Sequence, residues 1–292
     1  MELSQNKTFV LGLGLPKCGT TWFYKYLKLS KNFTPIPIKE YHIWDYRENP
    51  RLRRQINKAV FYRGRQRQFS KTFFKSEINK YRMRYFPSYY FSYFGQLLKE
   101  PFEVTADITP RYWRLDPQTF REIDIGFQRL GVEVKPILIL RDPTERFLSA
   151  VKMRIRREIK WHNRKLDIRN FDALVKEEIS GHGSLFAGTN EPLDFTVNQL
   201  PKILEQCINF YGKRLKIVFY EEMFTKSMIK ELSEHFNVEY NPHFLHKRVN
   251  ASKNYSEVSQ ETSNLIRHRF ANTYAYFYER YPITKTLWSA NQ

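Results

Sequence analysis

Short apolar runs alternate with stretches of helical periodicity along most of the chain. Runs of this length are typical of strands buried in a parallel sheet. Four of them are expected to be strands: residues 8–13 (TFVLGL), 102–108 (FEVTADI), 132–140 (VEVKPILIL) and 215–220 (LKIVFY). Helices are expected over residues 20–29, 223–236 and 256–280. The alternation predicts a three-layer α/β fold, in which helices flank a central, mostly parallel sheet.

Residues 47–86 interrupt this alternation with 13 Lys or Arg residues against two Glu residues. An unusually aromatic stretch follows directly, and the whole segment is expected to be helical. A chain of 292 residues can form one large domain or two small ones. We expect a single domain over residues 1–292 that carries this basic and aromatic helical insertion at about residues 47–100.

The net charge of +19 predicts an anionic partner, and nucleic acid, a membrane surface, a nucleotide and an acidic glycan all fit it. Two cysteines cannot form a disulfide framework for a chain of this size, which favours a reducing compartment. The sequence has no apolar run of the roughly 18 residues that a membrane span needs, and no signal peptide. We therefore expect a cytoplasmic protein, unless the chain is a trimmed catalytic domain. The oligomeric state is not predicted.

The octet from Gly14 to Thr21 (GLPKCGTT) lies between the first predicted strand and the first predicted helix. Its glycines have the G-x-x-x-x-G spacing of a phosphate-binding loop, in which backbone N–H groups and a helix N-terminus hold an anion. The Walker pattern places lysine directly after the second glycine, whereas here Thr20 has that position and the lysine is Lys17. The octet predicts an anion site unlike that of ATP and GTP enzymes. A glycine turn with a surface lysine is the simpler alternative, which the strand–loop–helix order disfavours.

Residues 14–22 (GLPKCGTTW) resemble the 5′-phosphosulfate-binding loop of the sulfotransferases that use 3′-phosphoadenylyl sulfate (PAPS), whose pattern is P-K-x-G-T-T-W. The resemblance covers most of the chain and is weakest over residues 47–100. It implies a P-loop-type fold and sulfuryl transfer from PAPS without a metal. Lys17 would neutralise charge that develops on the leaving 5′-phosphate oxygen. The resemblance also implies PAPS contacts for Cys18, Gly19, Thr20, Thr21 and Trp22.

A second anion motif begins where the strand at residues 132–140 ends. Asp142, Pro143 and Glu145 have the order of an N-cap, a first helical residue and a capping-box acid. The pattern Arg141-Asp142-Pro143-x-x-Arg146-x-x-Ser149 resembles the 3′-phosphate motif of the same family, and this implies that Arg141 and Ser149 bind that phosphate.

Strand ends share one edge of a parallel sheet, so Arg141 is expected to face the loop of Lys17. The alternative is that Arg141 and Asp142 form only a cap and an ion pair. Residues 250–254 (NASKN) lie where the family has a basic loop over the nucleotide, which makes Lys253 a further candidate contact.

The segment Lys39-Glu40-Tyr41-His42-Ile43-Trp44 contains the candidate base. Glu40 could take the proton of an acceptor hydroxyl, and His42 is the competing candidate. The segment resembles the K-E-x-H-F-F motif of the carbohydrate (heparan sulfate-type) sulfotransferase branch, in which the glutamate is the base. Lys39 and His42 are then candidates for acceptor binding. An ordinary surface Lys–Glu pair is the alternative.

Residues 104–113 (VTADITPRYW) resemble the acidic-x-T/S-P-x-Y segment that lines the acceptor cleft in that branch. Thr109 and Arg111 are therefore candidate acceptor contacts, and a plain strand ending at Pro110 is the alternative. His243 and His246 have metal-ligand spacing but no Cys or acidic neighbours, so we expect a polar loop and no metal.

These patterns together predict a PAPS-dependent sulfotransferase that acts on a hydroxyl or amine, with a carbohydrate acceptor favoured. The products would be the sulfated acceptor and adenosine 3′,5′-bisphosphate. A P-loop nucleotide kinase or phosphotransferase is one alternative, although the Walker lysine is missing and a second phosphate motif is present. The other alternative is a nucleic-acid-binding protein that uses the basic residues 47–86. If the protein is a sulfotransferase, no nucleic-acid partner is expected.

Overall fold

The computed structural model of the chain describes residues 7–65, 71–162, 165–181, 197–247, 249 and 255–289, apart from the side chains of residues 58–65, 71–74, 161 and 162. The chain divides into two compact units. Unit 1 comprises Met1–Leu140 and Gln206–Lys247, and unit 2 comprises Arg141–Glu205 and Arg248–Gln292. The division falls within α10 (Leu200–Tyr211). The expectation of a single domain stays a prediction.

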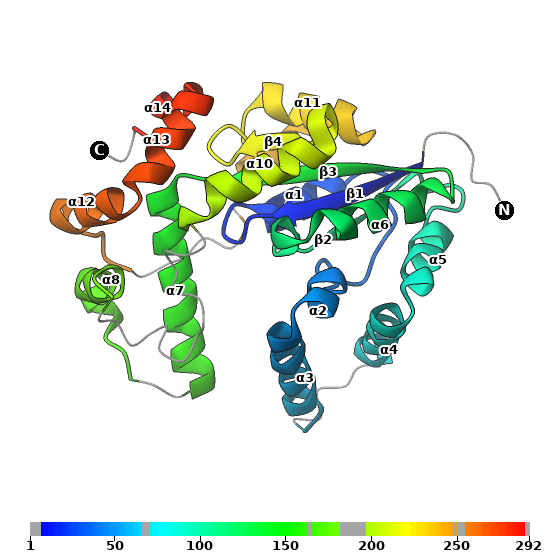
Figure 1. Cartoon of the computed structure of the whole chain (residues 1–292), viewed down its shortest axis with the longest axis horizontal. Helices are drawn as coiled ribbons and strands as arrows, with labels where there is room; N and C mark the ends of the chain where they lie inside the picture. The colour runs from blue at the N-terminus through cyan, green and yellow to red at the C-terminus, as the bar shows by residue number, and fades with distance from the viewer. Residues whose placement is uncertain are drawn as a thin grey trace. The chain divides into compact units, whose positions relative to one another are not determined.

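Unit 1 is built on a four-stranded parallel sheet with the strand order β2-β1-β3-β4 (Figure 1). The strands are β1 (Lys7–Gly14), β2 (Val104–Ile108), β3 (Val132–Leu140) and β4 (Lys216–Phe219). In the register, Thr8 of β1 lies opposite Val104 on one side and Glu133 on the other. All four predicted strands and their parallel arrangement are confirmed.

Helices flank this sheet. They are α1 (Thr20–Leu27), α2 (Trp44–Glu48), α3 (Pro50–Arg65), α4 (Lys71–Tyr85), α5 (Pro87–Leu97), α6 (Pro117–Gln128) and α11 (Lys226–Phe236). Phe9 of β1 packs on Phe127 of α6 and Phe94 of α5, with ring centroids 4.0 and 4.9 Å apart. Phe23 of α1 packs on Phe236 of α11 at 5.3 Å. Aromatic contacts of this kind bury large apolar areas and fix the layers, and the predicted three-layer α/β class is confirmed.

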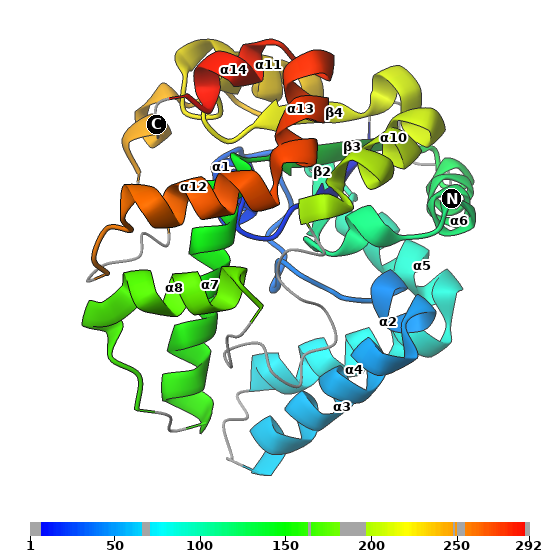
Figure 2. The same ribbon diagram turned by 60° about the vertical axis from the view of Figure 1, so that its left-hand side comes forward.

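The segment between α1 and β2 is largely helical, as expected for residues 47–100, and comprises α2 to α5. In both views of the ribbon, α3 and α4 lie farther from the strands than α2 does (Figures 1 and 2). Tyr90 and Phe94 of α5 are buried, whereas Tyr81 and Tyr85 of α4 are exposed. The aromatic stretch therefore contributes to the core through α5 and to the surface through α4.

Short 3-10 turns occur at Tyr112–Arg114, Gly212–Arg214 and Pro242–His246.

Unit 2 is helical where it is described. It contains α7 (Pro143–His162), a 3-10 turn at Ile168–Asn170, α8 (Phe171–Ile179), α12 (Gln260–Arg269), α13 (Ala271–Arg280) and α14 (Ile283–Leu287). The single helix predicted over residues 256–280 is two helices that meet at Phe270, whose ring is buried and packs on Phe147 at 5.7 Å.

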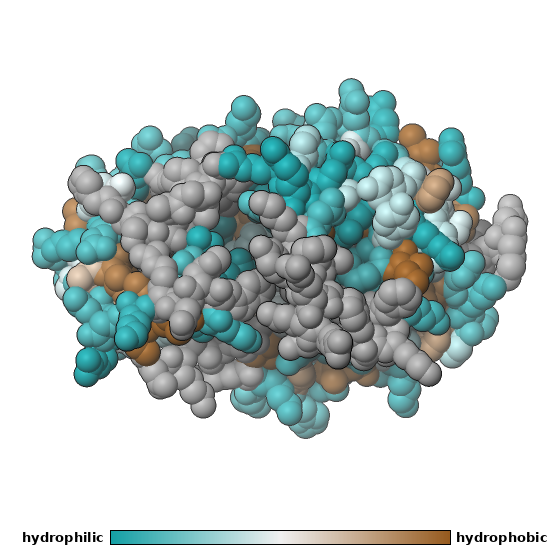
Figure 3. Space-filling model, turned by 90° about the horizontal axis from the view of Figure 1, so that it is seen from below, coloured by the Kyte–Doolittle hydropathy of each residue, from teal (hydrophilic) through white to brown (hydrophobic). Residues whose placement is uncertain are grey.

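Hydrophilic residues predominate over the described surface of the face in Figure 3. None of the helices that the structure describes is both long enough and apolar enough to cross a membrane.

Candidate functional site

The loop between β1 and α1 has a backbone that its sequence explains. Gly19 has φ +82°, and a Cβ atom there would lie 2.6 Å from Met223 Cε and 2.8 Å from a ring carbon of Tyr220. Only glycine fits both the conformation and the space. Leu15 N–H donates to the carbonyl of Ile139 at 2.9 Å, which fixes the loop to the end of β3. The loop therefore lies at the carboxyl edge of the parallel sheet, where ligands of such folds bind.

The start of α1 has the chemistry of an anion site. Among the described residues no side chain caps this helix, and its first turn contains no acidic residue. Its first N–H groups have no intrahelical acceptor and coincide with the positive end of the helix dipole. Lys17, half-buried and with φ +72°, contributes an ammonium group to the same loop. This donor set fits a phosphate or a phosphosulfate group.

Cys18 and Trp22 of the loop motif are buried and contact other parts of the protein. The Cys18 thiol lies 3.8 Å from the carbonyl of Pro16. Trp22 Nε1 donates to the carbonyl of Lys247 at 3.0 Å, and its ring stacks on Tyr26. Both side chains support the loop from the protein side, and contacts of Cys18 and Trp22 with PAPS stay predictions.

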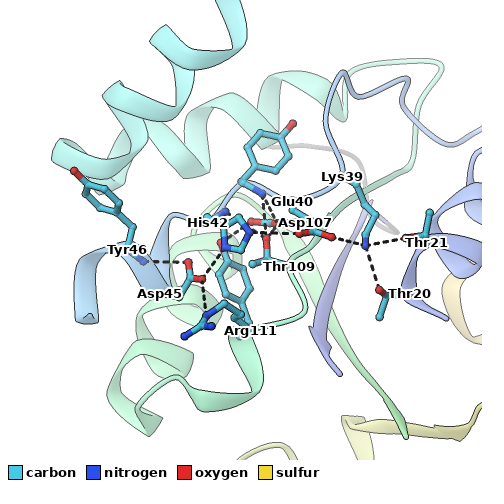
Figure 4. Close-up of polar contacts among 12 residues, drawn as sticks. Thr20, Thr21, Lys39, Glu40, His42, Asp45, Tyr46, Asp107, Thr109 and Arg111 are labelled. Carbon is cyan, nitrogen blue, oxygen red and sulfur yellow. Dashed lines mark hydrogen bonds and ion pairs between the residues drawn. The ribbon is translucent and has the colours of Figure 1, made fainter. Parts of the chain in front are cut away.

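Lys39 connects the loop to the candidate base (Figure 4). Its Nζ atom donates to Glu40 Oε1 at 2.6 Å, to Thr20 Oγ1 at 3.1 Å and to Thr21 Oγ1 at 3.4 Å. Only 13% of the Lys39 side chain is exposed, which does not fit an ordinary surface ion pair. Two motifs that the sequence presents separately therefore meet at one ammonium group.

His42 lies between two carboxylates. Its Nδ1 atom is 2.7 Å from Asp45 Oδ2 and its Nε2 atom is 3.3 Å from Glu40 Oε2. Burial lowers the pKa of His42, but the hydrogen bonds and charges of Asp45 and Glu40 outweigh burial and raise the pKa to about 9. The imidazole is therefore protonated at neutral pH and cannot accept a proton there. A protonated His42 leaves Glu40 as the candidate base, and the base role of Glu40 stays a prediction.

Glu40 is held ionised by the same contacts. Burial raises its pKa, but the hydrogen bonds and charges of His42 and Lys39 together lower the pKa to about 2. A carboxylate with so low a pKa is a weak base. The basicity of Glu40 increases if Lys39 or His42 moves away from it and pairs with another anion.

The candidate acceptor residues differ in exposure. Thr109 is fully buried, and its hydroxyl donates to Asp107 and accepts from the backbone of Tyr41. This favours a supporting role for Thr109 over direct contact. Arg111 is one-third exposed with Nε 4.0 Å from Asp45 Oδ2, so it lies beside His42. An acceptor contact from Arg111 stays a prediction.

The second anion motif lies in unit 2. Asp142 caps α7 by accepting from Glu145 N–H at 2.9 Å, and Pro143 is the first helical residue, as predicted. Arg141 Nη2 donates to Glu145 Oε2 at 3.0 Å. Ser149 follows Glu145 by four residues and shares its helix face. Arg141 and Ser149 are both half-buried, which fits a site that an anion can reach.

Three further predictions concern Arg141, Lys253 and the pair of His243 and His246. Whether Arg141 faces the loop of Lys17 stays a prediction, and Lys253 lies outside the described residues. His243 and His246 are in the turn Pro242–His246. No group of His, Cys, Asp and Glu in the described part of the chain could hold a metal ion.

Sequence reasoning missed three residues of the site: Asp45, Asp107 and Tyr112. Asp45 could have been found, because it follows His42 by three residues and an acid at that spacing can orient an imidazole. Asp107 could also have been found, since a carboxylate within a buried strand requires partners. Asp107 and Tyr112 are also the acid and the tyrosine of the acidic-x-T/S-P-x-Y pattern, so that pattern was a signal for both residues.

Comparisons with known proteins support the fold. No family model matches the sequence, and no curated protein matches it. The crystal structure of a sulfotransferase from Alicyclobacillus acidocaldarius is similar over 95% of both chains, with 16% identity and a TM-score of 0.53. A sulfotransferase domain from the curacin biosynthetic pathway has 16% identity and a TM-score of 0.44 over 85% of this chain and 80% of its own. The first likeness shows that the chain has the P-loop α/β fold of a sulfotransferase.

Proposed function

We propose that the protein transfers the sulfuryl group of PAPS to a hydroxyl or amine of an acceptor. One observation carries the proposal: the Lys39 ammonium group joins the carboxylate of Glu40 to the hydroxyls of Thr20 and Thr21 at the start of α1. The single side chain of Lys39 therefore contacts both the candidate base and the helix start that can bind an anion. Such proximity suits sulfuryl transfer, in which a deprotonated acceptor attacks a sulfuryl group held at an anion site.

In this reaction the acceptor oxygen or nitrogen forms a bond to sulfur while the bond from sulfur to the 5′-phosphate oxygen breaks. Glu40 takes the proton of the acceptor. Lys17 stabilises the negative charge on the leaving oxygen, and Gly19, Thr20 and Thr21 hold the phosphosulfate. Arg141 and Ser149 bind the 3′-phosphate, for which a guanidinium and a hydroxyl are suited.

Transfer of the proton requires that Glu40 become more basic than it is here. Lys39 is placed to turn from Glu40 towards an anion at Thr20 and Thr21, since its ammonium group already reaches both hydroxyls. The pKa of Glu40 would then rise when PAPS binds. Binding of the donor would thus activate the base.

A carbohydrate acceptor with negative charges is the finer part of the proposal. The rings of Tyr81, Tyr85 and Phe86 are 58%, 55% and 60% exposed, and the first two lie 4.7 Å apart. Exposed rings can stack on the apolar faces of sugars. The guanidinium groups of Arg53 and Arg84 lie over the ring of Tyr46, 5.5 and 4.4 Å from its centroid.

Tyr46 connects this surface to the base. Its backbone N–H donates to Asp45 Oδ1 at 3.0 Å, and Asp45 in turn holds His42 (Figure 4). Rings and cations therefore adjoin the residues that hold Glu40. An extended anionic sugar chain could contact both.

The experiment that tests the donor is calorimetric titration of the full chain with adenosine 3′,5′-bisphosphate, with ATP and 5′-AMP as controls. Tight binding of the bisphosphate that is lost in Lys17→Ala and in Arg141→Ala supports the proposal. The exposed lysines Lys25 of α1 and Lys160 of α7 provide matched controls, Lys25→Ala and Lys160→Ala, which should bind normally. Equal binding of ATP would instead favour a kinase.

The acceptor is then sought with ³⁵S-labelled PAPS and four probes: desulfated heparin oligosaccharides, neutral maltooligosaccharides, phenols and alkyl amines. Label on the anionic sugars supports the finer proposal, and label on any other probe corrects it. Nucleic acid is tested with a DNA oligonucleotide. Binding that survives the combined Lys17→Ala and Arg141→Ala change but is lost in high salt would favour the nucleic-acid alternative.

A further inference from the structure

The carboxylate of Asp107 is fully buried near the end of β2 and has four hydrogen-bond donors. Thr109 and Tyr41 N–H donate to Oδ1 at 2.6 and 3.4 Å. The hydroxyls of Tyr112 and Tyr90 donate to Oδ2 at 2.8 and 3.1 Å. A buried charge is tolerated only with such partners. The four donors therefore satisfy the buried carboxylate of Asp107.

Two of these hydroxyls also accept hydrogen bonds from the segment that follows Glu40. Thr109 Oγ1 accepts from the N–H groups of Tyr41 and His42 at 3.1 and 3.4 Å. Tyr112 OH accepts from Ile43 N–H at 3.1 Å. The backbone N–H groups of three consecutive residues are therefore held by two hydroxyls.

The direction of these bonds depends on the carboxylate. A hydroxyl has one hydrogen to donate, and an ionised carboxylate can only accept. Thr109 and Tyr112 must therefore donate inward to Asp107, which leaves their lone pairs for the N–H groups of residues 41–43. Burial raises the pKa of Asp107, and the four bonds oppose it, so that the pKa is about 6. The group is thus mainly ionised at neutral pH.

The segment held in this way needs support. His42 has φ +53°, in the left-handed region that non-glycine residues seldom adopt. Such a conformation persists only where its surroundings determine it. It allows the His42 ring to lie between Asp45 and Glu40, at 2.7 and 3.3 Å.

We propose that Asp107 is a positioning residue, which acts through Thr109 and Tyr112 to hold the segment of residues 40–43 in the conformation that places Glu40 and His42. Its value for catalysis rests on the proposed function, in which Glu40 is the base. The positioning itself is a property of the fold and can be tested separately.

Tyr112→Phe and Tyr90→Phe form a matched pair for the test. Both tyrosines are fully buried and both donate to Asp107 Oδ2, but only Tyr112 also accepts from the segment. We expect Tyr112→Phe and Asp107→Asn to lower the pKa of His42, followed by NMR titration of the histidine ring, by about one pH unit towards its ordinary value. Tyr90→Phe should shift the pKa of His42 less than Tyr112→Phe does, because it removes one donor to Asp107 but no bond to the segment.

Kinetics give the second readout. With the best acceptor of the ³⁵S screen, Tyr112→Phe should lower kcat by about 10- to 100-fold. Affinity for adenosine 3′,5′-bisphosphate should not change, because the loop of Lys17 is not altered. Tyr90→Phe should lower kcat less than Tyr112→Phe does, even if it lowers the melting temperature as much.

Equal effects of the two Phe variants on the His42 pKa and on kcat would overturn the proposal, since Asp107 would then only stabilise the core. If Asp107→Asn fails to fold, the comparison of the Phe variants decides alone. If the unaltered protein neither binds the bisphosphate nor transfers sulfur, the proposed function is wrong. The NMR titrations would still decide whether Asp107 positions the segment.

Discussion

The Nζ atom of Lys39 lies 2.6 Å from Glu40 Oε1 and at the same time 3.1 Å from Thr20 Oγ1, so one ammonium group joins the candidate base to the anion-binding loop. A cation shared in this way couples two events. Any anion that attracts Lys39 to the loop removes a positive charge from the neighbourhood of Glu40, and the basicity of Glu40 rises.

Removal of the Lys39 charge should therefore have two opposite effects. In Lys39→Met the pKa of Glu40 should rise from about 2 towards its ordinary value, since a hydrogen bond and a charge are lost. Turnover should nevertheless fall by roughly 10- to 100-fold, because the loop loses a cation that stabilises charge in the transition state. The measurements are kcat with labelled PAPS and NMR titration of the Glu40 carboxyl carbon. Lys31→Met, at an exposed site, is the control, and a turnover equal to that control would remove Lys39 from the mechanism.

Glu40→Gln tests the base directly. The amide keeps the shape of the side chain but cannot take a proton, so kcat should fall by roughly 10²- to 10⁴-fold. Affinity for adenosine 3′,5′-bisphosphate should stay within a small factor, because Glu40 does not belong to the phosphate loop. Glu239→Gln, at an exposed position, controls for the loss of one negative charge. Retention of activity in Glu40→Gln would assign the proton transfer to another group.

The charge of His42 predicts how stability depends on pH. The pKa of His42 in the fold is about 9, above the value of about 6.5 for an unfolded chain. The stability that protonated His42 contributes is therefore fully present below pH 6.5 and is lost as the pH rises through 9. For Glu40 the sign is reversed: its pKa is lowered to about 2, so its contribution is present above about pH 4.5 and is lost as the pH falls towards 2.

Denaturant unfolding of the unaltered protein and His42→Gln at several pH values measures this effect. The difference in unfolding free energy should be on the order of 1 kcal/mol near pH 6, after allowance for solvent screening. It should shrink above pH 9. His268→Gln, at an exposed site in unit 2, should show no such dependence. A constant difference from pH 6 to pH 10 would contradict the charged state assigned to His42.

The strands and the phosphate loop could be predicted from the sequence, because both depend on local patterns. Apolar runs gave the strand at residues 132–140 with its observed bounds. The spacing of Gly14 and Gly19 indicated the loop, and the order of Asp142 and Pro143 indicated the start of α7. Each of these signals lies within a few residues of what it specifies.

The network of Asp107 could not be predicted in the same way. Tyr90 and Asp107 are 17 positions apart, and only the fold brings the tyrosine hydroxyl to the carboxylate. The break at Phe270 was missed as well, because the helical periodicity of the sequence continues through it. Contacts between distant residues are not contained in local periodicity.

Gly19→Ala tests the requirement for glycine in the loop. A methyl group there would lie 2.6 Å from Met223 Cε, at φ +82°. Gly212→Ala is a matched control, because Gly212 also has positive φ, +54°, but none of the described residues lies within 4 Å of the added carbon. We expect Gly19→Ala to destabilise the protein by about 1–3 kcal/mol more than Gly212→Ala does. It should also weaken bisphosphate binding, which Gly212→Ala should not do. Equal losses in both variants would show that only backbone strain matters.

The exposed rings of α4 lead to the prediction about the acceptor. Tyr81→Ser with Tyr85→Ser removes two rings that are more than half exposed, and so should not disturb the core. If the rings stack on sugars, the double variant should raise KM for an anionic oligosaccharide by about 10-fold or more, at roughly 1 kcal/mol per ring. Bisphosphate affinity and kcat at saturation should not change, because the rings lie outside the base and the loop. Leu265, exposed on α12, gives the control Leu265→Ser. A KM unchanged by the loss of both rings would place the acceptor elsewhere, and would leave the transfer chemistry of Glu40 and Lys17 as it stands.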